Sequence, residues 1–562
     1  MNTPENRVGF NLTDEPWIRA RLTNGTTTEL SLRDVFRQAR QVDSLAGDIP
    51  TQDLALLRLL LAVLQRVVVT NLADLDREPD PIDAWTDLWQ APDLPWTEVN
   101  TYLDRWQDQF DLLDPDRPFM QVAGLRTARD DIGDVKKIVA DIPDGNPFFT
   151  TRWSEGTVAL SFAEAARWLV HCQAFDISGI KTGVVGDKSV KGGKSYPIGT
   201  GWAGKLGGLY IEGDNLRETL LLNLMLRLPG HDYIDSLDAD LPCWEYPPRT
   251  VDTPAHQPTG PADLYTWQSR RIRFTHDGSR VIGLVLTNGD RLDPQNRHGL
   301  EPLTGWRRSA AQEKKLGSTQ VYMPAEHKAD RAMWRGLQAV LPSTGTKTSD
   351  GAPFLPPAIA SWLGGFADHG VISLNRTLQM RACGVVYGSN NSTIAEIVDD
   401  TLAIYAVLLS DAGNGLVGLA NDCVTNTDQA VFALGLLAAN LESAAGGDAE
   451  SAAGPKERAR ERAYFAIDHA FRRWLADLGP DTDQDKAKDA WHLQARQLLE
   501  KVASELVSAA GPAAFVGHPV TIRGQQTWMT SGRAEQVFRA ALRKALPLSD
   551  EPSSETKERS AS

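Results

Sequence analysis

Cysteine is scarce in this sequence, and its four residues lie far apart. Cys172, Cys243, Cys383 and Cys423 form no CxxC pair. Structural zinc sites need closely spaced thiols, and a disulfide framework needs a denser set of cysteines. The sequence therefore predicts no metal site, no disulfide scaffold and no cofactor.

Positive charge is also in deficit. The 58 lysine and arginine residues are outnumbered by 73 aspartates and glutamates, so the formal net charge is −15. A chain this acidic is not drawn to DNA by its overall charge. Any contact with nucleic acid must come from local patches, or from basic partner subunits that carry most of the phosphate contacts.

No apolar run in the chain is suited to cross a bilayer. The longest, LALLRLLLAVLQRVVV, is interrupted by Arg58, Gln65 and Arg66, which favours a buried helix. The first ten residues, MNTPENRVGF, lack the apolar core of a signal peptide. These features predict a cytoplasmic protein with no membrane partner.

The common catalytic motifs are missing as well: the sequence has no HExxH, no GxSxG and no Cys-His arrangement of interpretable spacing. Two His-Asp dipeptides resemble the ligands of metal-dependent phosphohydrolases. His276-Asp277 precedes a glycine and is explained by a hairpin turn. His231-Asp232 follows Pro229-Gly230 in a loop, whereas that chemistry places the pair on a helix with further ligands. We expect a protein that is not an enzyme; a metal-dependent nuclease or phosphohydrolase using His231-Asp232 is the alternative.

One stretch reverses the acidic character of the chain. Residues 176–208 contain ten glycines and five lysines but only two acids. Glycine lets a backbone approach a ligand closely, and lysine supplies positive charge, which together suit phosphate or nucleic acid. Gly193-Lys194-Ser195 resembles the end of a phosphate loop, but Lys188 stands where that motif needs glycine, and Pro197 opposes the helix that should follow. The stretch is a nucleic-acid loop or a long flexible surface loop.

The hydrophobic pattern predicts an α+β protein. A large mixed α/β domain over residues 1–391 precedes an antiparallel helical bundle over 392–548, and a polar tail over 549–562 is expected to be disordered. Short breaks between amphipathic helices favour antiparallel neighbours. The helices predicted in this region span residues 393–412, 428–444, 455–478, 484–509 and 532–546.

Several local signals refine the first domain. Asn24-Gly25 predicts a hairpin turn, and Ser161 with Glu164 predicts the start of a helix by a capping box. Asn215 with Glu218 resembles a second capping box, which opens a buried helix that ends at Pro229-Gly230. Residues 270–292 read as a three-stranded meander, and the polar, basic residues 301–327 read as a surface loop.

Five segments, taken in order, resemble one protein family. They are FNLTDEPWI near the N-terminus, RPFMQVAG at 117–124, QAFDISGIKTGVVGD at 173–187, GLYIEGDNLRETLLLNL at 208–224 and WRRSAAQEKKLG at 306–317. In this order and spacing they are similar to the large subunit, CasA, of the type I-E CRISPR surveillance complex called Cascade. The similarity extends over nearly the whole chain, although no single segment is decisive.

The resemblance implies a mixed α/β domain followed by a four-helix bundle, without catalytic activity. It implies recognition of the protospacer-adjacent motif (PAM) in double-stranded DNA, help in opening the duplex and recruitment of a helicase–nuclease. The implied partners are the other Cascade subunits, the CRISPR guide RNA and target DNA, and the guide RNA reads most of the sequence. A purely structural scaffold subunit is the remaining alternative.

The resemblance also implies site residues. The family reads its motif largely from the minor groove with a glycine-containing loop, a lysine and a wedge at the tip of a turn. The DNA-binding residues so implied are Ser178, Gly179 and Lys181 in the loop, Lys314 or Lys315 as the lysine, and Asn390-Asn391 as the wedge, where some members carry glutamine at the second position.

The adjacent aromatics of GNPFFTTRW can be read in two ways. From the residues alone they are either a core anchor for a loop or a stacking element at a binding surface. The resemblance places Phe149 in a loop that contacts the end of the guide RNA and the adjacent subunit. Some relatives carry cysteine clusters that look metal-binding; this chain has none, so zinc is not implied here.

Overall fold

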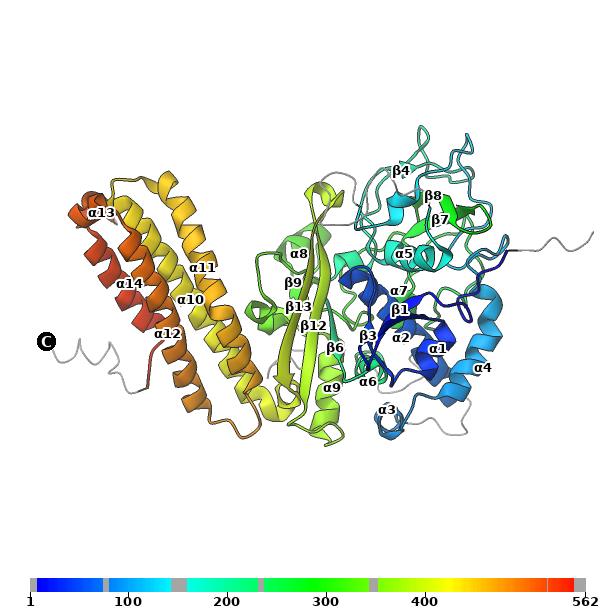
Figure 1. Ribbon diagram of the computed structural model, residues 1–562, viewed down its shortest axis with the longest axis horizontal. Coiled ribbons are helices and arrows are strands. Elements are labelled where there is room, and N and C mark those ends of the chain that lie inside the picture. The colour runs from blue at the N-terminus through cyan, green and yellow to red at the C-terminus, as the bar shows by residue number, and fades with distance from the viewer. Residues whose placement is uncertain are drawn as a thin grey trace, which may run out of the picture. The chain divides into compact units, whose positions relative to one another are not determined.

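The computed structural model describes residues 8–73, 80–142, 159–230, 237–342, 352–522 and 524–549 (Figure 1). The chain forms two compact units. The first comprises Met1–Met333, Gly345–Val371 and Leu378–Thr401, and the second comprises Trp334–Thr344, Ile372–Thr377 and Leu402–Ser562. The expected order, a mixed α/β region followed by packed helices, is confirmed.

The mixed unit contains short helices and several small sheets. Its helices are α1 (Leu32–Arg37), α2 (Pro50–Ala73), α3 (Pro81–Gln90), α4 (Trp96–Trp106), α5 (Phe162–Phe175), α6 (Leu216–Leu222), α7 (Pro261–Tyr265), α8 (Ala310–Leu316) and α9 (Ala358–Asp368). Its first strands are β1 (Ile18–Leu22), β2 (Thr27–Leu30), β3 (Val42–Leu45), β4 (Lys181–Thr182), β5 (Lys194–Ser195) and β6 (Gly208–Glu212). The later strands are β7 (Arg270–His276), β8 (Val281–Asn288), β9 (Trp306–Arg308), β10 (Tyr322–Pro324), β11 (Phe354–Leu355), β12 (Thr377–Tyr387) and β13 (Ile394–Tyr405).

Helix α2 is the buried helix that the long apolar run predicts, and it packs against α4, α5 and α7. The polar residues that interrupt the run all have partners. Arg58 forms a bidentate ion pair with Glu301 (2.8 and 2.9 Å), and both side chains are buried. Arg66 donates to both carboxylate oxygens of Glu245, and the neutral Gln65 donates one hydrogen bond to Asp240. A buried charge is tolerated because it is paired. These pairs therefore hold the segments that carry the partner carboxylates in place around α2.

The local signals at turns and helix starts are confirmed. Strands β1 and β2 pair through the Asn24-Gly25 turn. The Ser161 hydroxyl accepts the Glu164 amide at 3.1 Å at the start of α5, and Asn215 does the same for Glu218 at α6. The predicted end of α6 at Pro229-Gly230 is wrong, because regular helix stops at Leu222. There the Asn223 side chain bonds to both the amide and the carbonyl of Ile211, which draws the chain out of the helical path.

Two further predictions in this unit are wrong. Residues 270–292 form two strands, β7 and β8, and not three, because the chain does not turn at Asn288-Gly289: the amides of Gly289 and Asp290 donate to the carbonyls of Ser269 and Gln268 and continue the same antiparallel pairing. Residues 301–327 are not a surface loop. They form β9, α8 and β10, with β9 in the middle of the sheet β10-β9-β11.

The helix predicted over 393–412 is also wrong, since residues 394–405 form strand β13 of the sheet β13-β12-β6. Its β-branched residues favour a strand. Asp399 of β13 binds the guanidinium of Arg381 on β12 through two oxygens, at 2.6 and 2.9 Å. This cross-strand pair stabilises the two strands against each other. In the predicted helix, the same carboxylate would only have been part of a solvent-exposed face.

The helical unit is a bundle of four long helices: α10 (Asn414–Ala444), α11 (Ala449–Ala476), α12 (Gln484–Ala509) and α14 (Ser531–Ala545) (Figure 1). Helix α10 packs against the other three. In residues 455–478 the apolar side chains at three- and four-residue steps face the core: Ile467, Phe471, Trp474 and Leu478 are buried, and Tyr464 is half-buried. A short helix α13 (Pro512–Val516) and a hairpin of β14 (His518–Ile522) and β15 (Gln525–Met529), which the sequence pattern did not reveal, connect α12 to α14.

Candidate nucleic-acid interface

The Gly/Lys stretch forms a loop that leaves α5 and returns to the same place before β6. Asp176 ends α5, and its carbonyl accepts the Gly201 amide at 2.9 Å. The guanidinium of Arg270, at the start of β7, donates to the carbonyls of Ile177 and Gly199, both at 2.9 Å. One buried arginine therefore closes the neck of the loop, which begins and ends at a fixed point.

The same arginine belongs to a buried charged triad. The carboxylate of Asp176 accepts the Arg270 guanidinium and the Lys181 ammonium, the latter at 2.7 Å, and only 12% of the Lys181 side chain is exposed. Burial raises the pKa of Asp176, but Arg270 and Lys181 outweigh it, so the pKa lies below its usual value and the group stays ionised. The ammonium of Lys181 thus has an internal partner; its contact with DNA stays a prediction.

The middle of the loop is a small hairpin. Strands β4 and β5 pair antiparallel and are connected by residues 183–193. At the end of this connection, the amide and carbonyl groups of Lys191 and Lys194 bond to each other across a two-residue turn. The turn residues, Gly192 and Gly193, have φ of 58° and 71°, the left-handed values that a tight hairpin turn needs. The Gly-Gly-Lys-Ser sequence is therefore a hairpin turn, and its Lys-Ser pair lies in a strand where a phosphate loop would begin a helix.

Gly179 lies near the start of the loop and faces open space. A Cβ atom built on Gly179 has no neighbour within 4 Å. The preceding Ser178 is buried, whereas the following Ile180 is 56% exposed. The protein's own packing therefore leaves room for a side chain at this position.

The wedge residues form the tip of the turn between β12 and β13. Asn390 and Asn391 are exposed and have φ of 56° and 55°, a conformation that asparagine tolerates better than most residues. The Gly388 amide donates to the Thr393 carbonyl at 2.9 Å and closes the turn behind them. The turn therefore projects two short amide side chains away from an ordered base.

These two elements, far apart in the sequence, are joined directly. The Ser178 amide donates to the Asn391 carbonyl at 2.8 Å. Just behind this contact, the Tyr387 hydroxyl donates to the Phe175 carbonyl at 2.6 Å. The structure thus brings Ser178 and Gly179 of the loop next to the Asn390-Asn391 turn, as one composite tip.

Lys314 and Lys315 lie on a different element, the last turn of α8. Ser309 caps the start of this helix, and Gly317, with φ of 64°, ends it. Both lysines are exposed. Glu313, between the two caps, binds Arg308 and accepts the amides of Gln320 and Val321, which holds α8 against the end of β9. The helix and the composite tip share neither a strand nor a sheet.

Two of the sequence predictions lie outside the described residues: Phe149 and the His231-Asp232 dipeptide. The tail beyond Ser549 lies outside them too. Over the described ranges, no three His, Cys, Asp or Glu side chains come together in a way that could hold a metal ion. In those same ranges no helix has both the length and the apolar character to cross a membrane.

Sequence reasoning missed the residues that hold the composite tip in place, chiefly Asp176, Arg270 and Tyr387. Asp176 was visible as the acid that follows a helix, and Arg270 as one of three arginines in RRIRF. Nothing in the local pattern shows that they pair. Their partners come from segments about 90 to 210 residues away, as the bonds of Arg270 to Asp176 and of Tyr387 to Phe175 show.

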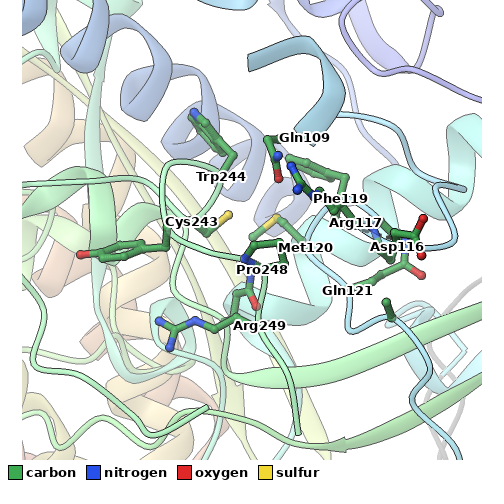
Figure 2. A pocket seen from close by; sticks show the side chains of 14 residues that line it. Gln109, Asp116, Arg117, Phe119, Met120, Gln121, Cys243, Trp244, Pro248 and Arg249 are labelled. Carbon is green, nitrogen blue, oxygen red and sulfur yellow. Dashed lines mark hydrogen bonds between the residues drawn. The ribbon is translucent and has the colours of Figure 1, made fainter. Parts of the chain in front are cut away.

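A separate small hollow, partly open to solvent, lies beside the RPFMQVAG segment (Figure 2). The segment anchors the core there. The ring of Phe119 stacks on Phe110 with centroids 5.2 Å apart, and Gln121 accepts the Phe274 amide at 2.8 Å. Burial raises the pKa of the Cys243 thiol in its wall to about 12, so the thiol stays protonated and is a poor nucleophile. This motif serves packing, and no residue of the composite tip lines the hollow.

Comparison with known proteins identifies the family of this chain. A family model described as CRISPR-associated protein Cse1 matches residues 11–502. The chain belongs to the Cse1 family. The crystal structure of Thermobifida fusca Cse1 is 42% identical with a TM-score of 0.83, over 96% of this chain and 98% of that one.

Two further relatives extend the comparison. CasA/Cse1 from Thermus thermophilus is 29% identical over 350 residues, which are 60% of this chain and 62% of that protein. A chain of a structure described as a CRISPR RNA-guided surveillance complex is 21% identical, with a TM-score of 0.67, over 96% of this chain and all of that one. At that identity it shares the fold alone.

Proposed function

We propose that this Cse1-family chain is the large, non-catalytic subunit of an RNA-guided antiviral CRISPR complex. In this proposal it recognises the PAM in double-stranded DNA, helps to open the duplex beside it and recruits the helicase–nuclease. Its partners are the other Cascade subunits, the guide RNA and the target DNA. The family match supports the assignment to such a complex, together with the shared fold of a chain from a CRISPR RNA-guided surveillance complex.

The observation that carries the DNA-reading role is the hydrogen bond from Ser178 to Asn391. It joins the segment proposed to read the minor groove to the turn proposed to separate the first base pair. Reading and opening must occur at neighbouring base pairs, so the two elements have to lie side by side. A bond between backbone groups fixes that spacing whatever side chains the two positions carry.

The exposed backbone at Gly179 suits the minor groove. That groove is about 6 Å wide, so a residue without Cβ can lie against base edges where a side chain would clash. Its pattern of donors and acceptors is degenerate, which fits a reader that tolerates several motifs. Lys314 or Lys315 would add one charged contact from α8. Inserting an asparagine at a base step costs a few kcal/mol, which the surrounding contacts must supply.

The acidic net charge is consistent with this division of labour. A subunit that met DNA alone would need many phosphate contacts, and each would make its affinity depend on salt. This chain contributes a few contacts that read shape, while basic neighbours and the guide RNA hold the rest. We therefore expect the isolated chain to bind DNA weakly.

Gel shifts with the assembled complex test the proposal. The preferred motif is first identified from a library of duplexes with a randomised PAM. We expect binding to depend on the PAM in the complex, and the complex to lose its PAM dependence when this subunit is left out. Nuclease activity of the isolated chain that is lost in His231→Ala would contradict the proposal. So would DNA affinity that does not change in any variant of the composite tip.

A further inference from the structure

We propose that the β4–β5 hairpin is a second DNA contact, which grips the phosphate backbone of the duplex through Lys188, Lys191 and Lys194. This inference rests on the proposed function, because it assumes that the composite tip meets duplex DNA. It adds a different kind of contact, one that supplies affinity without reading sequence.

The first observation is that two like charges face each other on this hairpin. Lys191 and Lys194 exchange backbone hydrogen bonds of 3.1 and 3.2 Å, so they are directly opposite and their side chains point to the same face. Like charges in this arrangement are destabilising by themselves. Both side chains are exposed, and the structure pairs neither ammonium with an acid in the described part of the chain. An external anion would remove the repulsion.

The second observation is the lack of acids around this pair. From Lys188 to Gly208 the sequence contains no aspartate or glutamate. Asp187, just before, already accepts the amide and the hydroxyl of Ser189 at 2.7 Å. Lys188 is 89% exposed, and its nearest acid, Asp252, is 4.0 Å away at the limit of an ion pair. Residues 187–208 contain four lysines and one acid, so this stretch is locally positive in a chain of net charge −15.

The third observation is that the hairpin stands on an ordered base. Ser195 is buried, and the Asn288 side chain of β8 donates to the carbonyls of Ser195 and Tyr196 at 3.2 and 2.8 Å. Val184 packs in a core cluster with residues of β8 and of the 122–125 segment. The lysines therefore project from a fixed frame, which limits the freedom lost when they bind.

The chemistry of these groups favours the backbone of a polymer over a small phosphate ligand. Lysine acts as a flexible point charge, and three such charges along one exposed hairpin suit a row of phosphates better than one enclosed anion. Duplex DNA is favoured over guide RNA because the same loop carries Ser178 and Gly179, the residues proposed to lie in the minor groove. Backbone contacts beside a groove reader fix its register on the duplex.

The test uses the assembled complex and a labelled duplex, with dissociation constants measured over salt concentrations from about 50 to 200 mM. The variant is Lys188→Gln/Lys191→Gln/Lys194→Gln. Each lost phosphate contact lowers the slope of log affinity against log salt by about 0.9, so the triple variant should lower it by about 2 to 3. The ratio of affinities with and without a PAM should stay within about twofold of wild type, since phosphates carry no sequence information.

Two controls complete the design. Lys486→Gln/Lys501→Gln/Lys544→Gln removes the same charge from exposed positions on α12 and α14 and should leave the slope unchanged. The triple arginine variant at 188, 191 and 194 keeps the charge and should keep the slope. An unchanged slope in the glutamine variant would overturn the inference, as would a defect confined to guide-RNA binding or assembly. If wild type shows no PAM dependence, the proposed function itself fails; if it does and the slope stays fixed, only this inference fails.

Discussion

The Ser178 amide and the Asn391 carbonyl are hydrogen-bonded at 2.8 Å. Because both groups belong to the backbone, substitutions of the two side chains leave the bond in place. The bond also sets the limits of the composite tip, since Gly179 follows one partner and Asn390 precedes the other. Variants at these positions therefore change the side chains of the composite tip and leave the backbone hydrogen bond that joins its two elements.

The wedge is tested with Asn391→Gly. Glycine adopts the φ of 55° at this position without strain, so the variant removes the side chain and keeps the turn. We expect the complex to bind PAM-bearing duplex close to normally but to open it at least about tenfold more slowly, since unstacking a base step takes a few kcal/mol. The fluorescence of 2-aminopurine next to the PAM reports opening. Asn390→Gly removes the other side chain of the proposed wedge from the same turn and shows which of the two acts; normal opening in both variants would contradict the wedge.

The lysine contact is tested with Lys314→Ala and Lys315→Ala, made separately. Both lysines are exposed on the last turn of α8, so neither change should affect folding. A charged contact at a base edge is worth about 1 to 3 kcal/mol. We expect one variant to weaken PAM-dependent binding by about 5- to 100-fold and the other to have little effect. Equal affinity in wild type and both variants would show that α8 does not touch the motif.

The closing of the loop neck is tested with Arg270→Lys. A lysine keeps the charge near Asp176 but cannot also reach the carbonyls of Ile177 and Gly199, so buried acceptors lose their donor at about 1 to 3 kcal/mol. Arg271→Lys is the control, because Arg271 is equally buried but pairs with Asp290 at 2.7 Å. Chemical denaturation should show both variants destabilised. Only Arg270→Lys should reduce the preference for PAM-bearing duplex; if both keep the preference, Arg270 supports stability alone.

The helix that carries the loop has a pH dependence of its own. Burial lowers the pKa of His171 to about 3, although Asp176 opposes the shift. The unfolded chain, with a pKa near 6.5, binds the proton first, so stability is full above that value and falls as pH decreases. The histidine should make the isolated chain about 2 kcal/mol less stable at pH 5 than at pH 7.5. Unfolding curves of His171→Gln should lack that contribution; an identical pH dependence in variant and wild type would contradict it.

The sequence predicted the parts of this fold that depend on neighbouring residues. Helix starts at Ser161 and Asn215 and the turn at Asn24-Gly25 follow from side-chain and backbone chemistry within four residues, so they were predicted correctly. Strand β13 was taken for a helix because its side chains alternate irregularly between apolar and acidic. It is a strand because it pairs with β12, and the sequence of β13 alone gives no information about that partner.

The candidate site was also only partly predictable from the sequence. Similarity to a family pointed to Gly179 and to Asn391 separately, but not to the bond that joins their two segments. The resemblance also implied Lys181 as a DNA contact. Its ion pair with Asp176 belongs to a triad with a buried arginine of β7, which the local sequence does not indicate. The residues proposed to touch DNA could be named from the sequence, whereas the residues that hold them in place are found only once the chain is folded.

The proposed reading of the PAM in the minor groove depends most directly on Gly179. A Cβ atom built there meets no atom within 4 Å, so Gly179→Asp should fold and assemble as wild type does. Its carboxylate would clash with base edges and repel the phosphates of the groove. The decisive measurement is the affinity of the assembled complex for duplexes with and without the PAM, in wild type, Gly179→Ala and Gly179→Asp. We predict that Gly179→Ala weakens the preference and Gly179→Asp abolishes it; a preference that survives intact in Gly179→Asp would contradict the account.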